Sequence, residues 1–396
     1  MPNMLDYMAE NGDKSFRELP FGPVDGLVFA QLSYCDYQAA NGELPASLQE
    51  IRPNVQGGVK PEDAALLNAA ARNSRYADVV AYRFVSRFDE EIPLQFAAVT
   101  FLLPDGSAYI SFRGTDSTLA GWKEDFNLAF MTPVPAQTEA LRYLETVADI
   151  LSCPLRVGGH SKGGNLAVYA SAFCRERTQE RILEIFNNDG PGHDLTTIRS
   201  EGYQRVLGRM TTILPKSSVI GMLLEHEERY RVVDSDARGL FQHNPYSWQT
   251  RGSDFAYLPR TTAYSERLNE SIREWLTGMD AQKRKFLTDT VFDVLSASDA
   301  RTLGELRHNP HVLTPIFAAL MKLNPEDRRA MTELLFQFAK TAASQYGQLA
   351  ADTIQPFRNF RDVSRDENAG GAEKWNALKG VMDMIRERFV DTEDGK

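Results

Sequence analysis

The stretch LRVGGHSKGGNLAVYASAFC, residues 155–174, joins a short apolar run to a pattern of helical spacing and places Ser161 at the junction. Gly159 and Gly163 lie two residues to either side of this serine, which matches G-x-S-x-G between a strand and a helix. Such a turn is sharp and strained, and larger residues at the two glycine positions would collide with the strand and the helix. The pattern predicts that the Ser161 hydroxyl is exposed at the carboxyl edge of a sheet.

Two backbone N–H groups are candidates for binding a negative charge next to this hydroxyl. The helix that follows the serine directs the positive end of its dipole, and the N–H of Lys162, toward an oxyanion. The second donor is Thr115 in ISFRGTDS, which ends a strand upstream of the serine. We therefore interpret Ser161 as a nucleophile, with Thr115 and Lys162 as its oxyanion hole. The alternative is that the glycines only allow a helix to pack closely on a strand.

The surrounding sequence predicts an α/β fold with a mostly parallel sheet and helices on both faces. Residues 84–115 contain two β-rich runs around the turn PDGS, which is a strong hairpin signal. Buried strands are predicted at ILEIFNND (182–189), MTTILP (210–215) and YRVVDSD (230–236). A helical pattern at 136–152 precedes the strand that leads to Ser161, so strands and helices alternate.

Length and composition indicate two parts. The 396 residues exceed the roughly 250–300 at which one core usually stops growing. We expect a first domain at 1–262 and an all-helical region at 263–396, because amphipathic helical patterns replace strands from about residue 265. Those helices could pack on the first domain, form a homo-oligomer, or cover its site.

The charge and the cysteines exclude several classes. With 54 acidic and 44 basic residues the net charge is −10, which disfavours binding to nucleic acid. No run has the length of a signal peptide or a membrane span, which predicts a cytoplasmic location. Three cysteines form neither a disulfide framework nor a zinc site, and no phosphate-binding loop, metal ligand pair or nucleotide motif occurs, so we expect no cofactor.

Two motifs together resemble those of a known family. FRGTDSTLAGWKEDFNL followed by GGHSKGGNLAVYA is similar to the class 3 lipases, which are α/β-hydrolases. The segments NMLDYMAENGDKSF, PVDGLVFAQLSYCDY and NNDGPG resemble an uncharacterised bacterial lipase-like family of the same superfamily. The resemblance covers roughly residues 3–255. It implies that Ser161 is the nucleophile, that Thr115 and Lys162 form the oxyanion hole, and that Trp122 and Asp125 are scaffold residues.

A serine nucleophile needs a histidine base, and in this fold the chain order is Ser, acid, His. His243, in GLFQHNPYSW, follows the last predicted strand, where the class 3 lipases have a similar histidine and tryptophan. We therefore predict that His243 is the base. We interpret His160 as a packing residue of the turn or as a residue that supports the catalytic groups from behind. His193 and His226 are weak candidates for the base, and His226 is expected on a solvated helix face. His308 and His311 are interpreted as a helix end or surface residues of the helical region.

The acid has two candidates. The class 3 pattern places it after the strand at 210–215, but this chain has ILPKSSVIGMLL there, with serines in its place. Asp189, at the end of the strand before, is the first candidate, because we expect the following GPG to expose it at the edge of the sheet. Asp234, which ends the strand before His243, is the alternative. Asp189 could also be only the cap of a turn.

Two further features concern the substrate. The apolar residues of 217–228 form a lid, a wall of an acyl pocket, or an ordinary core helix. Lys162 stands where the class 3 lipases commonly have leucine, so its amine either favours an anionic head group or points to solvent. We expect a lipase- or esterase-type serine hydrolase that cleaves a small-molecule ester or lipid. The alternative is a catalytically degenerate protein of this fold that binds an acyl ligand or a protein partner.

Overall fold

The computed structural model describes residues 1–38, 43–52, 55, 60–89, 91–92, 94–115, 127–128, 132–237, 242–263, 265–266 and 270, and in the last part 355–356, 358–363, 366 and 369–389. The chain divides into two compact units, Met1–Glu266 and Arg267–Lys396. In the second unit, the helix expected after the glycine-rich segment is α17 (Gly371–Phe389). The other helices expected from 265 onward, with His308 and His311, lie outside the described residues. Within the described part of the chain, no helix has the length and apolarity needed to cross a membrane.

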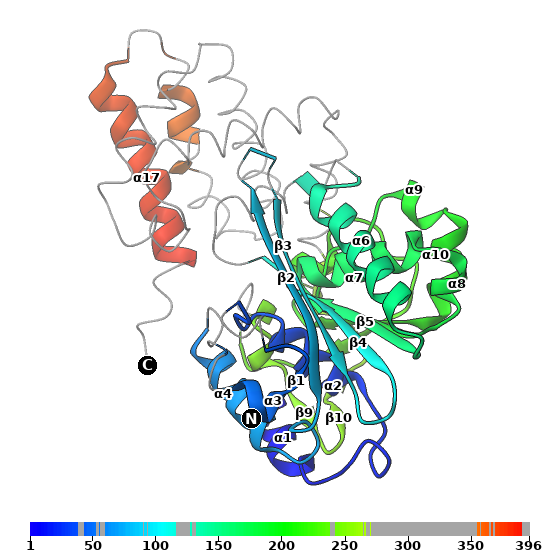
Figure 1. The fold of residues 1–396 in the computed structure, drawn as a ribbon. Helices are drawn as coiled ribbons and strands as arrows, with labels where there is room; N and C mark the ends of the chain where they lie inside the picture. The colour runs from blue at the N-terminus through cyan, green and yellow to red at the C-terminus, as the bar shows by residue number, and fades with distance from the viewer. Residues whose placement is uncertain are drawn as a thin grey trace. The chain divides into compact units, whose positions relative to one another are not determined.

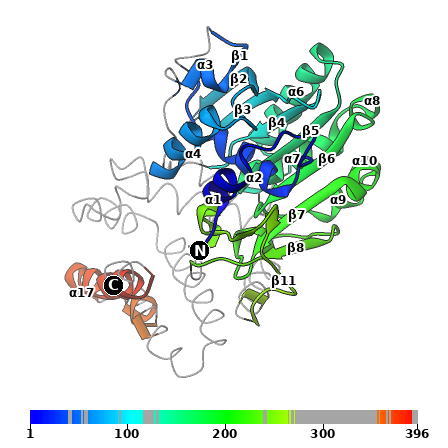
Figure 2. The same ribbon diagram turned by 90° about the horizontal axis from the view of Figure 1, so that it is seen from below.

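A nine-stranded mixed sheet forms the centre of the first unit (Figures 1 and 2). Of the eight strand pairs in the described part of this sheet, the four from β4 to β8 are parallel and the other four are antiparallel. The expectation of a mostly parallel sheet is therefore wrong outside the β4–β8 core. Short turns join β2 to β3 and β3 to β4, and short turns permit only antiparallel neighbours. In sheet order the strands are β1 (Ala46–Ser47), β2 (Val80–Asp89), β3 (Leu94–Leu102), β4 (Ala108–Phe112), β5 (Leu155–His160), β6 (Ile182–Asn188), β7 (Met210–Pro215), β8 (Tyr230–Val233) and β11 (Tyr257–Leu258). A separate small ribbon pairs β9 (Thr250–Arg251) with β10 (Asp254–Phe255).

Helices cover both faces of the sheet, as the alternation predicts (Figure 1). One face carries α1 (Met4–Asn11), α2 (Pro23–Leu32), α3 (Leu48–Ile51) and α4 (Pro61–Arg72), and the other carries α6 (Pro135–Ile150), α7 (Lys162–Phe173), α8 (Glu176–Gln179), α9 (Leu195–Ile198) and α10 (Glu201–Val206). Alternate residues of β3 enter the two cores: Val99 and Phe101 on the α2 side, Phe96 and Ala98 on the α6 side. Both faces of the sheet are therefore buried.

A buried ion pair holds the N-terminal helices together. Asp25, in the first turn of α2, accepts from Arg75 at 2.9 and 2.8 Å and from the Tyr76 hydroxyl at 2.5 Å. Both charged side chains are fully buried. Arg75 also donates to the backbone carbonyls of Lys14 and Leu19, so it fastens the loop between α1 and α2 to the same point.

Arg75→Met should lower the free energy of unfolding by about 3–5 kcal/mol, because it leaves the Asp25 carboxylate buried without its charge partner. Urea denaturation measures this loss. Arg87→Met is the matched control, because it breaks a pair with Glu139 in which Arg87 is half exposed, and it should cost less than about 1 kcal/mol. Equal losses for the two variants would contradict this account.

Candidate active site

Ser161 lies in a strained turn between β5 and α7. Its backbone has φ 58° and ψ −132°, in a region that residues with a side chain rarely adopt. A Cβ atom at Gly163 would lie 2.1 Å from the Phe112 carbonyl oxygen, and one at Gly159 would lie 2.3 Å from the Gly163 carbonyl carbon. The two glycines are therefore required by the close approach of β4, β5 and α7. The strained serine and the close packing of helix on strand therefore occur together. Ser161 is only 8% exposed, so the expectation of an exposed hydroxyl is wrong, because the neighbouring segments pack closely around the turn.

The structure brings three of the predicted residues into one hydrogen-bonded chain. The Ser161 Oγ lies 2.9 Å from His243 Nε2, and His243 Nδ1 lies 2.6 Å from Asp189 Oδ2. Because a carboxylate only accepts, Nδ1 carries the proton and Nε2 is left to accept the proton of the serine hydroxyl. The Asp189 side chain is almost fully buried, so the expectation that it is exposed is wrong, whereas the His243 side chain is 29% exposed.

Asp189 is held in place by its backbone. It follows β6 with φ 51°, and its N–H donates to the Ile213 carbonyl of β7 at 2.9 Å. The backbone carbonyl of its neighbour Asn188 accepts from the Ser161 N–H at 2.9 Å. The end of β6 is thus tied to the serine turn on one side and to β7 on the other.

The alternative acid, Asp234, is engaged elsewhere. Its Oδ1 accepts from Lys216 Nζ at 2.6 Å and from the Ser235 N–H at 2.8 Å. Within the described residues it forms no hydrogen bond with His243. The geometry therefore favours Asp189 over Asp234 as the partner of the histidine.

The Lys162 side chain differs from both expectations. It is buried, and its Nζ donates to the Gln95 carbonyl of β3 at 2.9 Å. The amine points neither toward a substrate nor into solvent, because the first residue of α7 lies on the side of the helix that packs against the sheet.

The segment that carries Thr115 passes directly beside the serine turn. A Cβ atom at Gly114 would lie 3.2 Å from the Ser161 Cβ and 2.5 Å from the His160 carbonyl oxygen. Thr115 follows at once and is partly exposed. The segment after β4, which ends at Phe112, therefore brings Gly114 against the turn, and Thr115 is the next residue along it. Trp122 and Asp125 lie outside the described residues.

His160 contacts His243, which corresponds to the second of its two expected roles, that of a residue behind the candidate catalytic groups. Its Nε2 donates to the His243 carbonyl at 2.9 Å, so Nδ1 is the acceptor for the Tyr34 hydroxyl at 3.2 Å. The two imidazole rings are 4.6 Å apart. Burial, with a smaller contribution from His243, holds the pKa of His160 well below its usual value. Tyr34 lies 126 residues from His160, and no local pattern connects them.

The segment 217–228 is neither a core helix nor a solvated one. It contains a single 3₁₀ turn, η3 (Ile220–Met222), and then pairs with the chain at His193. His226, expected on a solvated helix face, has a side chain that is only 9% exposed, and its Nδ1 lies 2.9 Å from Glu228 Oε1. Although burial opposes it, hydrogen bonds from His226, Thr212 and Tyr203 lower the pKa of Glu228 to about 2.

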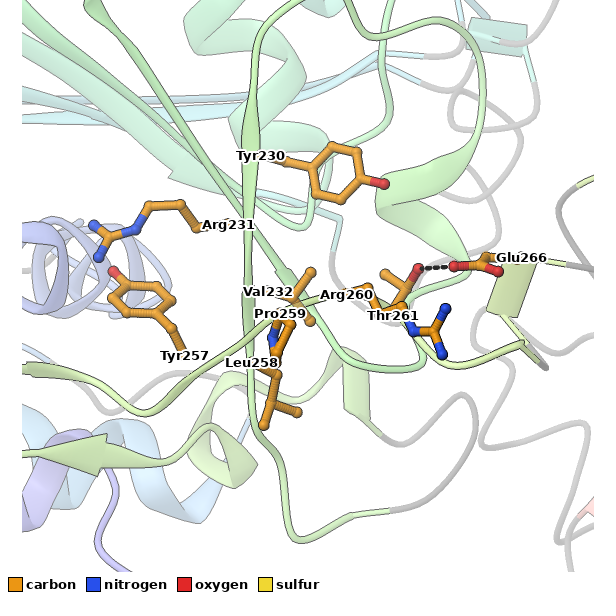
Figure 3. Close-up of a pocket in the computed structure, with 9 residues that line it drawn as sticks. All are labelled: Tyr230, Arg231, Val232, Tyr257, Leu258, Pro259, Arg260, Thr261 and Glu266. Atoms are coloured by element: carbon orange, nitrogen blue, oxygen red, sulfur yellow. Dashed lines mark hydrogen bonds between the residues drawn. The ribbon is translucent and has the colours of Figure 1, made fainter.

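A pocket of about 350 Å³ lies at the β8–β11 edge of the sheet (Figure 3). The Arg231 guanidinium lies over the Tyr257 ring at 3.5 Å, and Thr261 donates to Glu266 at 3.2 Å. None of Ser161, Asp189 or His243 lines it. Among the described residues, no three or more side chains are grouped so that they could hold a metal ion.

The parallel core and the strained strand–serine–helix turn are those of a lipase-like α/β-hydrolase fold. The chain belongs to the Mbeg1-like family, whose profile matches residues 70–293, more than half of its length. The resemblance to lipase-like α/β-hydrolases expected from the motifs is thus confirmed.

Two solved structures are similar to parts of this chain at low sequence identity. Rhizomucor miehei lipase in its propeptide complex is 16% identical, with a TM-score of 0.35 over 53% of this chain and 67% of that one. M37 lipase is 15% identical, with a TM-score of 0.36 over 51% of this chain and 70% of that one. The search of curated proteins returned no match.

Buried neutral histidines make stability depend on pH. Burial lowers the pKa of His193 to about 4. Below about pH 6.5 the unfolded chain binds a proton at this residue that the folded chain does not, so stability is full above pH 6.5 and falls toward pH 4. His193 alone should remove about 2 kcal/mol between pH 7 and pH 5, and His160 acts in the same direction.

Urea denaturation of the wild type and of His193→Gln at pH 7 and pH 5 tests this. The variant should lose about 2 kcal/mol less than the wild type over this interval. The same loss in both proteins would show that His193 takes up its proton in the folded state as well.

Proposed function

We propose that this protein is a serine hydrolase that cleaves carboxylic esters through an acyl-enzyme. The observation that carries the proposal is the hydrogen-bonded chain from Ser161 Oγ through His243 to Asp189, at 2.9 and 2.6 Å. The chain order and the strained position of the serine are those that acyl transfer requires. A degenerate binding protein would have no need for a histidine aligned with both groups.

In the proposed reaction, Ser161 Oγ attacks the ester carbonyl carbon while its proton passes to His243 Nε2. Asp189 stays ionised and stabilises the imidazolium. The N–H groups of Lys162 and Thr115 are the proposed donors to the oxyanion. The alcohol then leaves with the proton from His243. Water enters, gives a proton to His243 and attacks the acyl carbon, and the return of that proton to Ser161 releases the acid.

The substrate is proposed to be an uncharged ester or a lipid. Ile220, Met222, Leu223 and Leu224 are only partly buried, on the same segment whose Gly221 packs against Asp189. They form an apolar wall for an acyl chain. The burial of Lys162 removes the argument for an anionic head group. A cytoplasmic location and an oligomer formed through the C-terminal helices stay predictions.

The nucleophile is tested with a fluorophosphonate probe, which reacts with activated serines. The wild type should be labelled, and Ser161→Ala should lose the label completely. His243→Ala should slow labelling by about 10³-fold or more, because the hydroxyl loses its base. A folded wild type that stays unlabelled would contradict the proposal.

The acid is tested by the hydrolysis of p-nitrophenyl butyrate. Asp189→Asn should lower kcat/KM by about 10²–10⁴-fold, because an amide favours the wrong tautomer of His243 and does not stabilise its charge. Asp234→Asn is the matched control and should stay within about twofold of the wild type. A large loss in Asp234→Asn with Asp189→Asn unaffected would reverse the assignment.

A further inference from the structure

The second oxygen of Asp189 has a donor of its own. Ser218 Oγ lies 2.5 Å from Asp189 Oδ1, while Oδ2 faces His243. Ser218 is 2% exposed and Asp189 is fully buried. A buried carboxylate is costly unless donors satisfy its oxygens. Each carboxylate oxygen of Asp189 thus has a donor, Ser218 for Oδ1 and His243 for Oδ2.

The turn that carries Ser218 is itself fastened at several points. The Ser218 N–H donates to the Pro215 carbonyl at 2.9 Å, and its own carbonyl accepts from the Ser265 hydroxyl. Three residues on, Gly221 lies so close that a Cβ atom there would be 2.3 Å from Asp189 Oδ1. The turn after β7 therefore closes over the carboxylate on the side away from His243.

We propose that Ser218 is a positioning residue of the site, which extends the chain to Ser161–His243–Asp189–Ser218; this rests on the proposed function. Two fixed donors, one to each oxygen, determine the plane of the carboxylate and so the direction of its bond to His243. Ser218 touches no reacting atom and acts only through Asp189.

The neighbouring serine provides a matched control. Ser217 is also buried, but its hydroxyl pairs with Thr262 at 3.0 Å and not with Asp189. Its backbone N–H donates to Gln242 Oε1, and Ser217→Ala keeps that bond. Both alanine variants therefore remove one hydroxyl from the same turn, and they differ in whether the acid loses a donor.

With p-nitrophenyl butyrate as substrate, Ser218→Ala should lower kcat about 10- to 100-fold and leave KM within about twofold, because only the transition state needs the aligned imidazolium. Ser217→Ala should stay within about twofold of the wild type in both constants. Equal losses in the two variants, or a loss confined to KM, would overturn the proposal.

A double variant tests whether Ser218 acts through Asp189. In the Asp189→Asn background, adding Ser218→Ala should change kcat/KM by less than about twofold, since the carboxylate that the hydroxyl serves is already gone. The same fold loss as in the wild-type background would overturn the role and leave a merely structural one.

A measurement independent of hydrolysis separates this inference from the proposed function. The proton on His243 Nδ1, in a 2.6 Å bond to Asp189, should give a far-downfield NMR resonance. Ser218→Ala should shift or broaden that resonance, and Ser217→Ala should leave it unchanged. An unchanged resonance in Ser218→Ala would overturn the positioning role. A wild type that shows the resonance but hydrolyses no ester would refute the proposed function and, with it, the catalytic part of the inference.

Discussion

The site depends on the close contact between the Ser161 turn and β4. The start of α7 can pack this closely because Gly159 and Gly163 have no side chains; a Cβ atom at Gly163 would lie 2.1 Å from the Phe112 carbonyl oxygen. This contact holds Ser161 at φ 58° and presents its hydroxyl at the carboxyl end of β5. Strain of this kind costs on the order of 1–3 kcal/mol and persists only where the surrounding packing enforces it. Here the whole α6–α7 core provides that packing.

The other groups reach the hydroxyl because the strands from β4 to β8 are parallel and follow one another in sheet order. The carboxyl ends of such strands share one edge, where sites of α/β folds form. Thr115 follows β4, Asp189 follows β6, Ser218 follows β7, and His243 comes from the loop after β8. Each short connection delivers one functional group to this edge.

The sequence predicted the residues whose signals are local. The glycines around Ser161 identify the turn, and Asp189 and His243 end or follow strands in the required order. The predictions for the side chains of Lys162 and His226 were wrong, and the hydrogen bond between Tyr34 and His160 was not predicted. All three depend on which elements become neighbours in space. The hairpin turn PDGS predicted the antiparallel pairing of β3 with β4, whereas the division of the preceding β-rich run into β2 and β3 was not predicted.

The central claim is that Ser161, activated by His243 and Asp189, forms a covalent acyl-enzyme. Mixing the protein with p-nitrophenyl acetate, quenching in acid and mapping the acylated peptide by mass spectrometry tests this directly. The account predicts one acetyl group per chain, on Ser161, formed much more slowly in Asp189→Asn. An acetyl group on another residue, or hydrolysis with no acylated Ser161 even when deacylation is slowed by low pH, would contradict it.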